Sequence, residues 1–162
     1  MRNIAPCRWF DNQAEEAANF YVSVFKNSRV TAISHYGDGM PLPKGTVLEV
    51  SFELNGEDFL ALNGGPIFKA NEAISFMVLT DDQAETDRYW NAIVRSGGEE
   101  SACGWCRDKW GFSWQITPRA LLEAVNSPDK AAAKRAMDEM MKMKKIDIAA
   151  IKRAAAGEKS AA

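Results

Sequence analysis

The sequence predicts an α+β fold in which two β-α-β-β-β modules form a curved mixed sheet with a cleft, followed by C-terminal helices. Nearly the same acidic phrase occurs at residues 11–15 and 81–85. In both copies an apolar run precedes the phrase and an amphipathic segment follows it. A repeated unit of this length indicates two similar halves that bury their faces against each other. Beyond Pro118 the pattern becomes helical, which predicts an extension.

We place the first module at residues 1–66. The apolar run at residues 4–10 predicts a strand, and Asp11 or Asn12 can cap the helix that follows. The pair Asn55-Gly56 is typical of a two-residue hairpin turn. The apolar stripe of the helix comprises Ala14, Ala17, Ala18, Tyr21, Val24 and Phe25. The remaining strands are predicted at residues 30–36, 47–54 and 58–63.

The second module is placed at residues 72–118 and repeats this order. Its helix is predicted at residues 84–95, with a cap near Asp81 and with Gly97-Gly98 after its end. Pro118 ends the last strand. The strands of this module are predicted at residues 73–79, 99–103 and 113–117.

Residues 119–162 form the predicted C-terminal helical extension. A first helix is expected at residues 120–125, and Ser127 is the expected cap of a second helix with Pro128 at its first position. The paired modules can already bury their own sheet under their own two helices. The apolar stripes of the extension are therefore expected to contact a partner subunit in a homodimer. These stripes comprise Ala133, Met137, Met140 and Met141 on the helix at 129–143, then Ile148, Ile151 and Ala155.

Bulk properties narrow the function classes. The net charge is −2, which gives no basic field that would favour nucleic acid or an anionic membrane surface. Residues 129–162 hold nine Lys and Arg against five Asp and Glu, a local net charge of +4. No apolar stretch approaches the ~20 residues of a membrane span. Three cysteines without an export signal favour reduced thiols, so we expect a cytoplasmic protein.

The cysteine motif and the sole histidine could each take part in catalysis or metal binding, but a structural role is the expected one for both. Cys103 and Cys106 form a CxxC motif, but a redox CxxC needs its first cysteine at a helix N-terminus. A turn into a strand is expected after Cys106, so packing in a hairpin is the expected role. A zinc site is disfavoured because only Cys7 and His35 remain as soft ligands. His35 is the sole histidine and is expected to be structural or on the surface.

The doubled module resembles the vicinal oxygen chelate superfamily, which includes glyoxalase I, extradiol dioxygenases and bleomycin-resistance proteins. The resemblance is closest to its PhnB-like branch, whose members often carry the label 3-demethylubiquinone 3-methyltransferase-like. The motifs that carry it are Trp9-Phe10-Asp11, Ala14-Glu15-Glu16-Ala17, Phe20-Tyr21, Leu62-Asn63-Gly64-Gly65-Pro66, Cys103-Gly104-Trp105, Asp108, Gly111, Trp114-Gln115-Ile116, Pro118 and Met143-Lys144-Lys145-Ile146-Asp147-Ile148.

The resemblance implies four positions that hold a divalent metal in the metal-using relatives. None is a good ligand here, because such cations prefer carboxylate or imidazole groups. We therefore expect no metal and no other cofactor. No glycine-rich nucleotide-binding turn supports S-adenosylmethionine either. The four positions fall at Ile4 or Pro6, at or near Ala61, at Ser75 and at Gln115.

Strand alternation predicts which side chains face the cleft. Ser75, Met77 and Leu79 should share that face with Ser113, Gln115 and Thr117, whereas Phe76, Val78, Trp114 and Ile116 pack the core. Arg8 and Phe10 join the cleft face if Pro6 does. The candidate pocket residues are Arg8, Phe10, Asn63, Ser75, Met77 and Gln115.

Two main function classes follow. One is a metal-free module that binds a small aromatic or anionic molecule in a pocket between the two modules, as the bleomycin-resistance relatives do. The other is an enzyme of this superfamily with an atypical active site. The missing metal ligands favour the first class. A third interpretation is a structural homodimer without a ligand.

Overall fold

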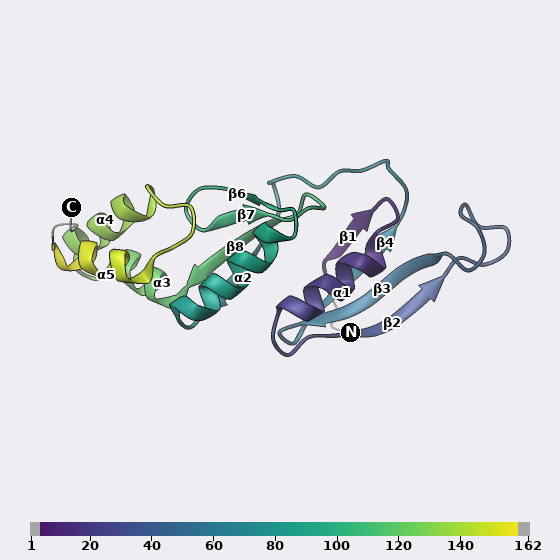
Figure 1. The fold of residues 1–162 in the computed structure, drawn as a ribbon, viewed down its shortest axis with the longest axis horizontal. Helices are drawn as coiled ribbons and strands as arrows, with labels where there is room; N and C mark the ends of the chain where they lie inside the picture. Colours follow the sequence, from purple (N-terminus) through teal and green to yellow (C-terminus); the bar gives the residue numbers. More distant parts are fainter. Residues whose placement is uncertain (1–3, 159–162) are drawn as a thin grey trace. The chain divides into compact units, whose positions relative to one another are not determined.

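Two units make up the chain, and the division falls between Ala70 and Asn71. The computed structural model describes residues 4–158 (Figure 1). Each unit contains a four-stranded mixed sheet and a helix, in the β-α-β-β-β order that the repeat predicts. The α+β fold class is therefore confirmed.

One helix and four strands form the first unit. Its elements are β1 (Cys7–Phe10), α1 (Ala14–Val24), β2 (Arg29–His35), β3 (Val47–Leu54) and β4 (Glu57–Asn63). The strand order is β1-β4-β3-β2, in which β1 and β4 are parallel and the other pairs are antiparallel. α1 covers one face of this sheet (Figure 1).

The hairpin and the core of the first unit follow from local sequence. Asn55 and Gly56 have positive φ angles of 49° and 83°, as a two-residue hairpin turn of this kind requires. Tyr21 of α1 is fully buried, and its ring stacks on Phe52 of β3 with the ring centroids 6.2 Å apart. The predicted stripe of α1 therefore faces the sheet.

The start of α1 differs from the expectation. Its N-cap residue is Gln13, whose side chain makes no capping hydrogen bond. The N–H of Ala14 instead donates to Oδ1 of Asn63, 2.8 Å away at the end of β4. The prediction of Asp11 or Asn12 as the cap was wrong because a side chain from a distant strand satisfies the first turn.

The second unit repeats the arrangement of the first. Its module consists of β5 (Ser75–Thr80), α2 (Gln83–Arg95), β6 (Glu99–Glu100), β7 (Trp105–Arg107) and β8 (Ser113–Pro118). The strand order β5-β8-β7-β6 matches that of the first sheet, and β5 again runs parallel to β8. Equivalent strands therefore occupy equivalent places in the two sheets.

Two local features of this module correct or refine the prediction. The strand expected at residues 99–103 is only two residues long, because a turn at Cys103 and Gly104 intervenes before β7. α2 begins with an arrangement similar to a capping box, shifted by one residue at its start. The side chain of Asp82 accepts a hydrogen bond from the N–H of Glu85, and the Glu85 carboxylate accepts one from the N–H of Asp81.

The C-terminal helices belong to the second unit. They are α3 (Arg119–Val125), α4 (Lys130–Met140) and α5 (Ile148–Ala156). The side chain of Asp129 caps α4 by accepting hydrogen bonds from two backbone N–H groups. The expected cap Ser127 was therefore wrong, and Pro128 lies before the helix.

A small apolar core holds these helices together. It consists of Leu121, Ala136, Ile146 and Ile151, with Met140 and Met143 packed against it. Ile151 is fully buried in this core. The apolar stripe that contains Ile151 therefore packs within the chain, and the prediction that this stripe needs a partner surface was wrong. Met137 and Met141 remain 41% and 63% exposed.

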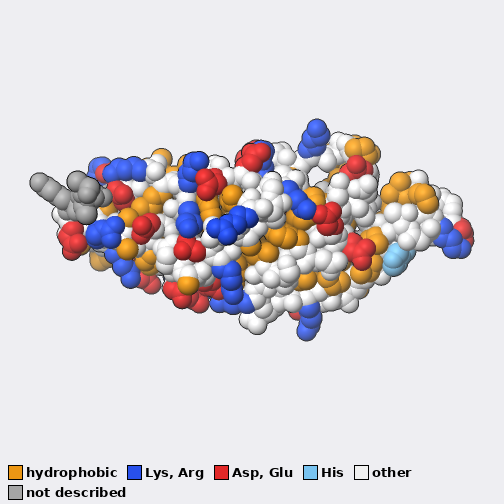
Figure 2. Space-filling view, in the orientation of Figure 1, with side chains coloured by type: hydrophobic (Ala, Val, Ile, Leu, Met, Phe, Trp, Pro, Cys, Tyr) orange, Lys and Arg blue, Asp and Glu red, His pale blue; other side chains and the backbone are white. Residues whose placement is uncertain are grey.

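The surface of the second unit mixes both signs of charge. Basic and acidic side chains alternate over the C-terminal helices on the face seen in Figure 2. The basic side chains within residues 129–158 therefore do not gather into one patch on that face. Within residues 4–158, no helix has the length and apolar character needed to cross a membrane.

Candidate functional site

The open face of the second sheet, the side away from α2, carries two of the predicted pocket residues in direct contact. Nε2 of Gln115 on β8 donates a hydrogen bond to Oγ of Ser75 on β5, and the two atoms are 2.8 Å apart. On the opposite face, Trp114 is 1% exposed and packs against Phe76. The two pairs thus lie on opposite faces, as the alternation predicts, but Ser113 and Thr117, which were expected on the open face with Gln115, are buried at 3% and 7% exposure.

Apolar side chains flank this polar pair. Met77 lies opposite Gln115 on β5, and Trp105 lies opposite it on β7. Directly opposed residues in a sheet have their side chains on the same face, with Cβ atoms about 5 Å apart. Met77 is 53% exposed and Trp105 is half-buried, so both present apolar surface beside the pair.

A small pocket of about 170 Å³ adjoins Trp105. Arg107 forms ion pairs there with Glu99 at 2.6 Å and with Glu72 at 3.7 Å. These carboxylates raise the pKa of Arg107, chiefly because its guanidinium donates a hydrogen bond to Glu99. The positive charge of the guanidinium is therefore already balanced by carboxylates of the same chain. The pocket is lined by Glu72, Glu99, Glu100, Ser101, Trp105, Cys106, Arg107 and Ser113.

The Ser75–Gln115 pair can make hydrogen bonds of both kinds. Because the Ser75 oxygen accepts from Gln115, its own O–H is available to donate outward. Oε1 of Gln115 is an acceptor, and the second N–H of its amide is a further donor. The open face therefore offers adjacent neutral donors and acceptors, framed by Met77 and Trp105.

This set of groups does not fit a divalent metal. Ser75 and Gln115 supply one hydroxyl and one amide, and these bond to each other. In the first unit, Ala61 is fully buried on the face covered by α1, and the open-face neighbour is Leu60, which has no donor atom. Within residues 4–158, no group of three or more His, Cys, Asp and Glu side chains is placed to hold a metal ion.

The first-unit candidates lie on the covered face. Arg8 is 2% exposed, and its guanidinium carbon lies 4.5 Å from the centre of the Tyr21 ring under α1. Phe10 is 3% exposed. Arg8 and Phe10 were expected on the cleft face only if Pro6 faced it. Strand alternation instead directs Cys7 and Trp9 to the open face.

Asn63 also has a structural role. Its Oδ1 accepts from the N–H of Ala14, and its Nδ2 donates to the carbonyl of Val47 at 3.0 Å. The side chain is 2% exposed and therefore ties α1, β3 and β4 together from inside the unit. The expectation that Asn63 faces an open pocket was wrong.

The cysteines lack the geometry of a redox site. No helix follows Cys106, which lies in β7, and Cys103 sits in the preceding turn with φ at 58°. Burial, reinforced by the Asp108 and Glu100 carboxylates, raises the pKa of Cys106 to about 12. Burial likewise raises the pKa of Cys7, with a further contribution from Glu49. A thiol of this kind is a poor nucleophile at neutral pH.

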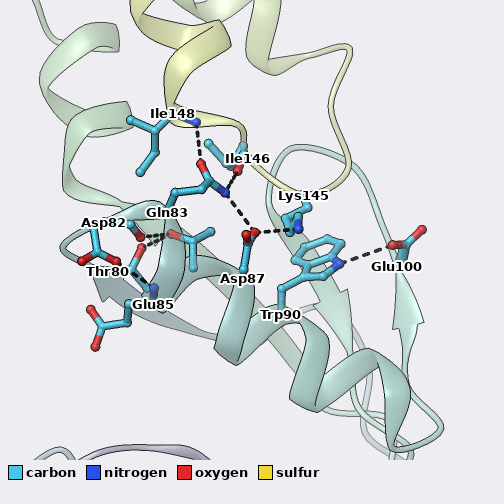
Figure 3. Close-up of polar contacts among 11 residues, drawn as sticks. Thr80, Asp82, Gln83, Glu85, Asp87, Trp90, Glu100, Lys145, Ile146 and Ile148 are labelled. Atoms are coloured by element: carbon cyan, nitrogen blue, oxygen red, sulfur yellow. Dashed lines mark hydrogen bonds and ion pairs between the residues drawn. The ribbon is translucent and has the colours of Figure 1, made fainter.

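The C-terminal residues meet α2 through a group of polar side chains (Figure 3). A larger cavity of about 520 Å³ lies at this place. Its central side chain, Gln83, donates to Asp87 and to the carbonyl of Ile146 and accepts from the N–H of Ile148. Lys145 pairs with Asp87 at 2.6 Å. These groups satisfy one another, so we interpret this region as a joint between α2 and the C-terminal residues.

Sequence reasoning missed Trp105 and Arg107 as part of the site. The strand that carries them is only three residues long, and Gly104 comes immediately before it. Three residues are too few for an alternating pattern of buried and exposed side chains to be recognised. The one available signal was the short alternation in Trp105-Cys106-Arg107. In the structure its central residue is buried and the two neighbours face the other side of the sheet.

Comparison with known proteins supports this fold. The family model described as 3-demethylubiquinone-9 3-methyltransferase matches residues 2–117. PhnB protein from Bacillus cereus is 31% identical, covering 72% of this chain and 99% of that chain, with a TM-score of 0.66. PA1353 from Pseudomonas aeruginosa is 20% identical over 73% of this chain and 98% of that chain, with a TM-score of 0.60.

A more distant structure shares the fold alone. The fosfomycin resistance protein FosX from Listeria monocytogenes, solved with Mn(II) and a sulfate ion, is 16% identical over 70% of this chain and 90% of that chain, with a TM-score of 0.51. A search among curated proteins gave no match. The C-terminal residues from 118 onward lie outside the region that the family model matches.

Proposed function

Because the chain belongs to the 3-demethylubiquinone-9 3-methyltransferase family, a PhnB-like branch of the vicinal oxygen chelate superfamily, we propose that it binds a small neutral molecule without a metal. The binding surface is the open face of the second sheet. The observation that carries the proposal is the hydrogen bond between Gln115 and Ser75. The resemblance described above implies that these are two of the positions where the metal-using relatives place ligands.

The ligand class follows from the groups on this face. Met77 and Trp105 favour a flat apolar body, and the Ser75–Gln115 pair favours a polar edge with both a donor and an acceptor. An anion is disfavoured because Glu72 and Glu99 already neutralise Arg107. Phenols and lactams have the required combination.

Binding is proposed in place of catalysis. The neighbours of Gln115 in the register, Met77 and Trp105, cannot act as general acids or bases, and Ser75 has no adjacent histidine. FosX was solved with Mn(II), but Ser75 and Gln115 of this chain are not the carboxylate and imidazole groups that such a cation prefers. The family's methyltransferase label is likewise not part of the proposal.

A thermal-shift panel tests the proposal. Neutral aromatic alcohols such as 1-naphthol should raise the melting midpoint, since a ligand at 100 times its Kd stabilises the native state by about 2.7 kcal/mol. Gln115→Ala and Ser75→Ala should abolish the shift. Ser23→Ala, on the exposed side of α1, is the control and should retain it. Stabilisation by 1-naphthalenesulfonate alone, or full retention in Gln115→Ala, would contradict the assignment.

We also propose that the protein is a cytoplasmic homodimer. Exposed Met137 and Met141 on and beside α4 support a contact with a second copy, because methionine packs well against irregular surfaces. Three free thiols support a reducing compartment. Light scattering on Met137→Lys/Met141→Lys should give half the wild-type mass, and an unchanged mass would place the contact elsewhere.

A further inference from the structure

We propose that residues 143–148, here called the strap, position Trp105 on the open face of the second sheet. This inference rests on the proposed ligand site, to which Trp105 contributes one wall. The strap lies outside residues 2–117, the part of the chain that the family model matches. The C-terminal residues would then tune a site that they do not touch.

The strap first fixes the turn that leads into β7. The N–H groups of Cys103 and Gly104 donate to the carbonyls of Met143 and Lys144, at 2.8 and 2.7 Å. Both turn residues have positive φ angles, 58° and 83°. Cys103 is not a glycine, so this conformation is costly unless neighbouring contacts hold it. The two hydrogen bonds to the strap supply such contacts.

The turn is also held from the side of the sheet. The carbonyl of Gly104 accepts a hydrogen bond from the N–H of Ile116 at 2.8 Å. A Cβ atom at Gly104 would lie 3.0 Å from the carbonyl oxygen of Ile116 and 3.1 Å from Cγ1 of Ile146. Gly104 therefore packs between β8 and the strap, and these contacts fix the direction in which the chain leaves the turn.

That direction determines where the next side chain lies. Trp105 follows Gly104 immediately and is paired with Gln115, so its indole stands on the same face as the Ser75–Gln115 pair. Cys106, one residue later, is buried on the opposite face. A small rotation of the turn would thus displace the indole from the pair.

The strap is itself anchored to α2 and to β6. Gln83 makes hydrogen bonds to the backbone on both sides of Asp147, at 3.0 and 2.9 Å (Figure 3). Lys145 pairs with Asp87, and Lys144 pairs with Glu100 at 3.2 Å. Gln83 is therefore a positioning residue, because it acts on Trp105 only through the strap.

The internal repeat supplies a matched control. Gln13 occupies the place in the first unit that Gln83 has in the second, but its side chain contacts only the neighbouring N–H of Asn12, at 3.3 Å, among the hydrogen bonds described for residues 4–158. Gln83→Ala and Gln13→Ala remove the same atoms from equivalent helix starts. Only the first substitution removes contacts with the strap.

The experiment uses the full chain labelled with 5-fluorotryptophan. The Trp105 resonance is assigned with Trp105→Phe and followed by fluorine NMR without ligand. We expect this resonance to move by more than its linewidth in Gln83→Ala and to stay in place in Gln13→Ala. If Gln83→Ala does not fold, Lys145→Ala removes the pair with Asp87 instead and should move the same resonance. A Trp105 resonance that stays in place in the folded variant would overturn the inference.

Binding of 1-naphthol separates this inference from the proposed function. The affinity should fall roughly threefold to thirtyfold in Gln83→Ala and remain unchanged in Gln13→Ala. Equal affinities in both variants, with a displaced indole, would overturn the role of the strap in the site. If the wild-type protein binds no neutral aromatic compound, the proposed function fails, while the fluorine spectrum still decides whether the strap positions Trp105.

Discussion

Replacing Asn63 by alanine should destabilise the first unit while leaving ligand binding in the second unit intact. The substitution removes two hydrogen bonds and leaves the N–H of Ala14 and the carbonyl of Val47 without the amide that they contact. Each buried group left unsatisfied costs about 1–3 kcal/mol. The site of the Val47 bond is only partly buried, so we expect a total loss of about 3 kcal/mol in the free energy of unfolding.

Denaturation in guanidinium chloride measures this loss, and a melting curve should show a midpoint lower by roughly 6–12 °C. Asn126→Ala is the matched control, because it removes a single exposed hydrogen bond to the carbonyl of Leu122. It should cost about 0.5 kcal/mol or less. If Asn63→Ala unfolds like Asn126→Ala, the structural assignment fails. A loss of 1-naphthol binding at unchanged stability would instead restore Asn63 to the pocket.

Three further outcomes are expected. In Gly64→Ala the new Cβ would lie 2.0 Å from the Trp9 ring, so calorimetry should show a loss of about 1–3 kcal/mol, whereas Gly37→Ala, 3.7 Å from its nearest neighbour, should be close to neutral. Lys145 lowers the pKa of Asp87, so the wild-type protein should be more stable than Asp87→Asn by a constant amount at neutral pH. This difference in the free energy of unfolding should vanish as the pH falls below about 4, because Asp87 then becomes protonated. A difference that persists at pH 2 would refute this pairing. With a pKa of about 12, Cys106 should resist Ellman's reagent at pH 8, so Cys106→Ser should leave the number of reactive thiols in the folded protein unchanged; a lower number would show that Cys106 is accessible.

The fold was predictable because its signals repeat. The acidic phrase at the start of each helix, the alternation in β5 and β8 and the Asn55-Gly56 turn all depend on residues close in sequence. Such local preferences agree with the tertiary structure in these segments, where the predicted elements appear with small shifts at their ends. The exceptions are β6, which is shorter than predicted, and β7, which was not predicted. For the same reason, Ser75, Met77 and Gln115 share one face of the second sheet, while their role in a ligand pocket stays a prediction.

The first-sheet candidates were misplaced because β1 has no clear phase. Cys7 and Trp9 are as apolar as Phe10, so alternation alone cannot tell which side is buried. Arg8 adds a misleading signal, since a charged residue is expected to face solvent. Here its guanidinium stacks against Tyr21 and Phe59, a contact that depends on residues 13 and 51 positions away. The strap was missed because its hydrogen bonds join segments distant in sequence.

The contacts at the starts of α1 and α2 imply that the two similar modules form their helices at different stages of folding. α2 carries its own start signal, since Asp82 and Glu85 satisfy its first turn within four residues. α1 has no such local cap and depends on Asn63, 49 residues along the chain. A contact of that separation forms only after a long loop has closed, which is slow and entropically unfavourable. The second module can therefore nucleate from its helix, whereas in the first module the β1–β4 pairing must come before a stable helix.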